Sequence, residues 1–121
     1  MKKIILLCLA VICLMGCSKE KISQGLYSCS AEGTTLYIEL LAGEDCILYF
    51  QGGRESSGFY HIKGDEITII GHATLEKKYS YVSYHFSYET PGKILSKDKF
   101  SITAEELGND ETHYCSFVRR Q

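Results

Sequence analysis

Apolar and polar residues alternate along this chain in short runs that end at glycine, aspartate or proline. The longest alternating run covers residues 79–90, where Val82, Tyr84, Phe86 and Tyr88 are expected to point to one side and the residues between them to the other. A period of two over this length is typical of a half-buried antiparallel strand and excludes an amphipathic helix. The same alternation recurs from Leu36 to Leu40 and in shorter runs near residues 60 and 67.

Turn-forming residues punctuate the chain about every ten residues, a spacing typical of an all-β sandwich or barrel. Pairs such as Glu32-Gly33, Gly52-Gly53 and Gly64-Asp65 offer the positive φ values that tight hairpins need. Pro91-Gly92 is expected to end the longest strand. These signals predict nine strands near residues 26–31, 34–41, 46–51, 58–63, 66–71, 74–78, 80–89, 99–103 and 112–119.

The short connections between these strands leave no room for the crossover helices of a parallel sheet. Eight or nine antiparallel strands in sequence order can bury their edges by closing into a barrel or by stacking as a sandwich. We favour a small up-and-down barrel, in which the first strand pairs with the last.

The first 17 residues have the composition of an export signal. Lys2 and Lys3 precede an uncharged apolar run over residues 4–14, which is too short to span a bilayer. The ending Leu14-Met15-Gly16-Cys17 resembles the lipobox of bacterial lipoproteins. The resemblance implies that the Cys17 thiol receives a diacylglycerol, that the signal helix 1–16 is removed, and that the new amine is acylated, for example with palmitate. An ordinary signal with a chance cysteine is the alternative.

Three segments follow from this interpretation: a signal peptide over 1–16, a lipidated tether over 17–24 and a β-barrel domain over 25–121. The Cys17 lipid would anchor the protein to a membrane. Ser18, the residue after the cysteine, is similar to an outer-membrane sorting signal, which implies a cell-envelope location at the outer membrane.

A second resemblance lies within the predicted barrel. The stretch from Tyr60 to Ile69, YHIKGDEITI, is similar to the Tyr-x-Ile-x-Gly-Asp-x-Ile-x-Ile hairpin of small lipocalin-like lipoproteins from gut Bacteroidetes. The closing segment over residues 114–120 resembles the aromatic and basic strand on which those chains end. The Gly-x-Trp signature of true lipocalins is absent, because Gly25-Leu26-Tyr27 has tyrosine in place of tryptophan. The resemblance implies a calycin-like barrel.

Six cysteines do not make a disulfide framework here. Two lie in the signal and Cys17 is the lipidation site, so Cys29, Cys46 and Cys115 form at most one internal bridge. If the first and last strands are neighbours, Cys29 and Cys115 are the candidate pair and Cys46 is the spare thiol. Three buried thiols are the alternative, and no Cys-x-x-Cys spacing indicates zinc.

Several chemistries are disfavoured. Removing the signal leaves 11 basic against 15 acidic side chains, without the basic cluster that nucleic-acid binding needs. The histidines are far apart in sequence and fit surface positions better than a metal site. No Gly-x-Ser-x-Gly motif or Gly-rich phosphate loop occurs. We therefore expect a non-enzymatic protein without a catalytic residue, cofactor or metal.

Nine tyrosines exceed what a small core needs, although strands favour tyrosine in any case. The sequence therefore predicts a small apolar ligand or an envelope protein as the partner, with Tyr60, Tyr84, Phe86 and Tyr88 as candidate ligand-binding residues. The alternative is an interaction or inhibitor module with a filled barrel that acts through loops such as 52–57 and 105–111. A hydrolytic enzyme is the third interpretation.

Overall fold

The structure, a computed structural model, describes residues 21–120. The expected signal peptide and Cys17 lie outside the described residues. Residues 21–120 contain no helix long and apolar enough to cross a membrane. The described elements are β1 (Gly25–Ala31), β2 (Thr34–Leu40), the 3-10 turn η1 (Ala42–Glu44), β3 (Asp45–Phe50), β4 (Ser56–Lys63), β5 (Glu66–Glu76), β6 (Tyr81–Phe86), β7 (Gly92–Ser96), β8 (Lys99–Glu106) and β9 (Thr112–Arg119).

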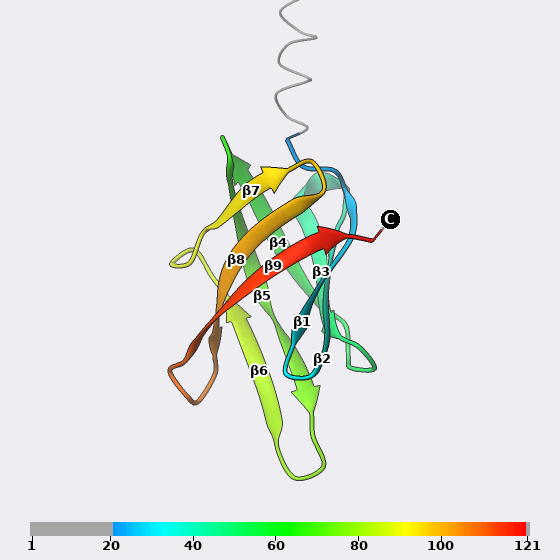
Figure 1. Cartoon of the computed structure of the whole chain (residues 1–121), viewed down its shortest axis with the longest axis vertical. Helices are drawn as coiled ribbons and strands as arrows, with labels where there is room; N and C mark the ends of the chain where they lie inside the picture. The colour runs from blue at the N-terminus through cyan, green and yellow to red at the C-terminus, as the bar shows by residue number, and fades with distance from the viewer. Residues whose placement is uncertain (1–20, 121) are drawn as a thin grey trace, which may run out of the picture.

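The strands form one antiparallel sheet that closes into a barrel (Figure 1). Eight strands make the ring, in the order β1-β2-β3-β4-β5-β6-β8-β9, and β7 is an additional strand. The ring closes where β1 pairs with β9, with Tyr27 opposite Arg119 and Ser28 opposite Val118. The all-β barrel and the pairing of its first and last strands are thus confirmed.

Strands β6 and β7 share one position in the barrel. Both pair antiparallel with β5 and with β8, β6 toward one end of the barrel and β7 toward the other. The residues between them, Ser87–Pro91, leave the ladder in a turn in which Thr90 N–H donates to Ser87 O. The strand expected over 80–89 is present but shorter, because β6 ends at Phe86, and β7 lies in a stretch for which no strand was predicted.

Strand β5 also differs from the prediction. Residues 66–71 and 74–78 were expected to form two separate strands, but β5 runs continuously from Glu66 to Glu76. Gly71 serves close packing here, because a Cβ at this position would lie 2.7 Å from Leu48 Cδ1. The glycine allows the β3 side chain to approach the β5 backbone.

Apolar side chains from alternate positions fill the barrel interior. Phe100 and Phe117 stack with ring centroids 5.1 Å apart, and Tyr27 packs on Phe100 at the same separation. Toward the other end, Phe50 meets Tyr84 edge-on at 5.5 Å. The fully buried side chains also include Leu36, Ile38, Leu40, Leu48, Ile67, Ile69 and Phe86. The period-two pattern thus supplies a packed core rather than a lined cavity.

The barrel begins before Gly25. Ile22 is only 6% exposed and belongs to the core cluster. Ser23 N–H donates to Lys97 O at 2.7 Å, and the Tyr27 hydroxyl donates to Ser23 O at 2.6 Å. Residues 21–24, the described part of the expected tether, are therefore attached to the barrel.

Candidate functional site

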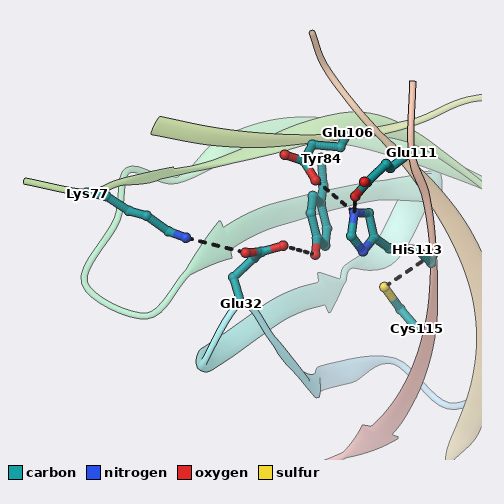
Figure 2. Close-up of polar contacts among 7 residues, drawn as sticks. All are labelled: Glu32, Lys77, Tyr84, Glu106, Glu111, His113 and Cys115. Atoms are coloured by element: carbon teal, nitrogen blue, oxygen red, sulfur yellow. Dashed lines mark hydrogen bonds and ion pairs between the residues drawn. The ribbon is translucent and has the colours of Figure 1, made fainter. Parts of the chain in front are cut away.

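A cluster of polar side chains lies at the end of the barrel opposite the start of the described chain, near the β1–β2, β5–β6 and β8–β9 connections (Figures 1 and 2). Glu32 comes from the β1–β2 turn, and Lys77 follows β5. Tyr84 belongs to β6, and Glu106 and His113 flank the β8–β9 connection. We call Glu32, Tyr84, Glu106 and His113 the end cluster.

Local backbone conformation places Glu32 in the cluster. Glu32 and Gly33 connect the paired residues Ala31 and Thr34, and both have positive φ, 55° and 76°. Two positive φ values in a two-residue loop are typical of a type I′ hairpin turn. Figure 2 shows the Glu32 carboxylate between Lys77 and Tyr84.

The Glu32 carboxylate binds both neighbours. Its Oε1 accepts a 2.9 Å hydrogen bond from the Tyr84 hydroxyl, and its Oε2 lies 3.4 Å from Lys77 Nζ. The Tyr84 hydrogen bond and the Lys77 ammonium lower the pKa of Glu32, against the opposing effect of burial. Burial and the Glu32 carboxylate raise the pKa of Tyr84, so its hydroxyl stays a proton donor. Tyr84 therefore orients Glu32 and is not an ionised nucleophile.

The His113 imidazole is held from two sides. Its ring stacks on Tyr84 with centroids 4.7 Å apart and an angle of 19° between the planes. Its Nε2 lies 2.8 Å from Glu106 Oε2 and 3.8 Å from Glu111 Oε2. Antiparallel pairing sets these positions, because His113 lies opposite Ala104 and Glu106 lies opposite Tyr84.

The end cluster brings two kinds of metal ligand together. One carboxylate oxygen from each of Glu32 and Glu106 and a ring nitrogen of His113 all lie within 4.8 Å of one another. All three side chains are partly buried. Imidazole nitrogen and carboxylate oxygen are ligands that divalent cations accept in proteins.

The predicted ligand-binding residues do not line one cavity. Tyr60, Tyr84 and Phe86 are buried in the core, whereas Tyr88 lies in the loop after β6 and is 73% exposed. Tyr88 does not continue the inward-facing series of Val82, Tyr84 and Phe86, because β6 ends two residues before it. The Tyr60 hydroxyl donates to Leu41 O at 2.7 Å. Tyr60 also lines an open depression of about 630 Å³ near Lys21, at the opposite end from the end cluster.

Sequence reasoning missed the end cluster. His113 was interpreted as a surface imidazole, Glu32 as part of a turn, and residues 105–111 as a loop. Glu32 and His113 are far apart in sequence and share no motif. Barrel closure brings the first hairpin beside the last, so only the β1–β9 pairing could have suggested their proximity.

All three cysteines of the barrel are free thiols in the structure. Cys29 and Cys115 are neighbours. The hydrogen bond between their thiols raises the pKa of Cys29 and lowers the pKa of Cys115. The Cys115 thiol also donates weakly to His113 O at 3.8 Å. Cys46 is buried elsewhere in the core, and burial raises the pKa of its thiol to about 12.

Comparisons with known proteins give no family for this chain. No protein-family model matches it, and neither a curated protein nor a solved structure matches it. The fold alone defines the class of protein: a closed antiparallel barrel with a filled interior and a polar cluster at one end.

Replacing Tyr84 by phenylalanine tests the hydrogen bond to Glu32. We expect Tyr84→Phe to cost about 1 to 2 kcal/mol of unfolding free energy at pH 7, because a buried hydroxyl loses a charged partner. The pKa of Glu32 is depressed below 4.5 in the folded state, so its contribution is present above that value and disappears as the pH falls through the folded pKa. Urea unfolding of both proteins at pH 7 and pH 3 measures the difference, which should shrink at pH 3.

Tyr27→Phe is the matched control. Within residues 21–120, the hydrogen bonds of the Tyr27 hydroxyl are to backbone carbonyl oxygens, those of Ser23 and Lys97. The cost of losing it should therefore be similar at both pH values. A Tyr84→Phe cost that does not change between pH 7 and pH 3 would show that Glu32 ionisation does not depend on this hydrogen bond.

Proposed function

We propose that this chain is a non-enzymatic lipoprotein, anchored to the outer membrane through Cys17, whose filled barrel binds an envelope protein with its outer surface and end loops. The observation that carries this proposal is the packed interior. A carrier of a small apolar molecule needs a concave apolar pocket. Among residues 21–120, aromatic and aliphatic side chains occupy the interior, and the mapped depressions lie at the surface with polar residues in their linings.

Exposed aromatic and aliphatic side chains support a protein partner. Tyr79 and Tyr81, on the β5–β6 connection and the start of β6, are 90% and 71% exposed. Leu107 is also exposed, and its backbone N–H donates to Ser83 O, which places the start of the β8–β9 connection beside β6. Tyrosine is enriched at protein interfaces because its ring is apolar and its hydroxyl is polar.

The arrangement of the ends fits this function. The described chain starts at the opposite end of the barrel from the β1–β2 and β5–β6 turns (Figure 1). In a chain anchored through Cys17, the end of the barrel with the β1–β2 and β5–β6 turns would point away from the membrane. Tyr79, Tyr81 and Leu107 would then be accessible to a partner in the surrounding compartment.

Native mass spectrometry of the protein purified from its own envelope tests both parts of the proposal. We expect a chain that begins at Cys17 and carries acyl groups, with no small molecule retained, together with a bound protein. Cys17→Ser should move the protein out of the membrane fraction, because acylation supplies the anchor. An unmodified chain that begins at another residue would refute the anchor.

Variants separate the partner surface from the interior. The double variant Tyr81→Ser, Leu107→Ser should reduce the amount of bound protein at least tenfold. Phe59→Ser, which changes an exposed aromatic residue on β4, is the matched control and should leave the bound protein unchanged. A retained apolar molecule without any protein would instead favour the ligand-carrier interpretation.

A further inference from the structure

We propose that Glu32, Glu106 and His113 form a binding site for a divalent transition-metal ion, with Zn²⁺ as the probe. This inference is independent of the proposed function. It begins with the ligand atoms, which are two carboxylate oxygens and one imidazole nitrogen within 4.8 Å of one another. A tetrahedral zinc site with bonds of about 2.0 to 2.2 Å keeps its ligand atoms about 3.4 Å apart. The three atoms are thus near enough to share one ion after side-chain adjustment alone.

The adjustment is small. His113 Nε2 and Glu106 Oε2 are 2.8 Å apart, a hydrogen-bond distance, and must separate by about half an ångström to hold a metal between them. The ion would take the place of the hydrogen bond between His113 Nε2 and Glu106 Oε2. Glu111 Oε2 lies 3.8 Å from His113 Nε2 and adds a further negative charge beside the three ligands (Figure 2).

Neighbouring side chains hold these ligands in place. Tyr84 stacks against the imidazole ring and donates its hydroxyl proton to Glu32, so one residue restrains two of the three ligands. Such outer contacts are usual around protein metal sites and affect metal affinity by about 10- to 100-fold. The backbone adds further restraint, because Glu106 N–H donates to Glu111 O at the base of the β8–β9 connection.

The charge of the cluster also favours a cation. Glu32, Glu106 and Glu111 supply three carboxylates around His113, and Lys77 is the cation paired with Glu32. The mixture of nitrogen and oxygen ligands distinguishes this group from a purely acidic surface patch. Imidazole suits zinc and other transition metals, whereas Mg²⁺ and Ca²⁺ prefer oxygen ligands alone.

Zinc titration of the full chain in detergent micelles, after removal of metal by a chelator, tests the site. We expect one Zn²⁺ per chain, bound more tightly than Ca²⁺, and a higher unfolding temperature with Zn²⁺. His113→Gln and Glu106→Gln should each weaken Zn²⁺ binding at least tenfold. His61→Gln is the matched control, because His61 also pairs with a carboxylate, that of Glu44, but at an exposed position.

The variant Lys77→Gln distinguishes a metal site from an ion-pair network that only stabilises the fold. Removing the ammonium group frees Glu32 Oε2, so Zn²⁺ should bind several-fold more tightly. The chemical shift of the His113 ring nitrogen on adding Zn²⁺ to the unaltered chain gives a readout that needs no variant. No stoichiometric Zn²⁺ binding, equal binding by His113→Gln, or tighter binding of Ca²⁺ than of Zn²⁺ would each overturn the proposal.

Discussion

Phe117→Ala is expected to lower the free energy of unfolding by about 3 to 5 kcal/mol. The Phe117 side chain is fully buried and stacks on Phe100 with an angle of 13° between the rings. Truncation removes this contact and leaves a cavity that the surrounding strands cannot close, because hydrogen bonds to both neighbours hold β9 in place. Total stabilities of small domains are about 5 to 15 kcal/mol, so the variant should be marginally folded.

Urea unfolding followed by far-UV circular dichroism measures this loss. Val118→Ala is the matched control, because Val118 is the next residue on β9, points outward and is 48% exposed. We expect it to cost less than about 1 kcal/mol. A Phe117→Ala cost as small as that of the control would contradict a packed interior, and with it the main argument against an internal ligand.

Oxidation is expected to join Cys29 to Cys115. A small-molecule disulfide such as oxidised glutathione accepts the two electrons, the two thiols lose their protons, and two reduced glutathione molecules leave. The strands are neighbours, and both cysteines belong to or pack against the core cluster. In a chain-entropy treatment, a bond that closes so long a loop adds up to about 4 kcal/mol.

The strand register limits how much the Cys29–Cys115 disulfide can stabilise the fold. The register between Ser28 and Val118, continued along both strands, places Phe117 rather than Cys115 opposite Cys29, so the two cysteines are diagonal neighbours. Diagonal Cα atoms are about 7 to 8 Å apart, so the strands must shift slightly to form the bond, and that strain offsets part of the stabilisation. Mass spectrometry after glutathione treatment should find two thiols fewer, with Cys46 still free, and unfolding should shift to higher urea. Cys46→Ser should leave this shift unchanged, and Cys115→Ser should abolish it. Free thiols at Cys29, Cys46 and Cys115 after oxidation would exclude the bridge.

Local pattern was sufficient to predict the barrel but not all of its strands. The alternation from Leu36 to Leu40 matches the inward side of β2, and the glycine-containing turns lie where the hairpins turn. The error at Ser87–Pro91 has a physical cause. A loop that interrupts a strand keeps the composition of the strand around it, and only the ladder with β5 and β8 shows where pairing stops.

The end cluster could not have been predicted from the same information. Period two assigns a residue to a face of its strand, and it placed Tyr84 correctly on the inner side. It does not give the height of a residue along the barrel, which depends on the register between strands far apart in sequence. Glu32 and His113 become neighbours through that register, so their chemistry is a property of the closed fold.

Because Ile22 is buried in the barrel, the segment between Cys17 and Ile22 limits how far the barrel can lie from the proposed lipid anchor. Only five peptide steps separate Cys17 from Ile22, and a fully extended chain covers at most about 3.3 to 3.6 Å per residue. An acylated Cys17 would therefore hold the near end of the barrel within about 18 Å of the lipid surface. The near end of such a protein would stay beside the membrane, and only the end that carries the β1–β2 and β5–β6 turns would reach farther into the surrounding compartment.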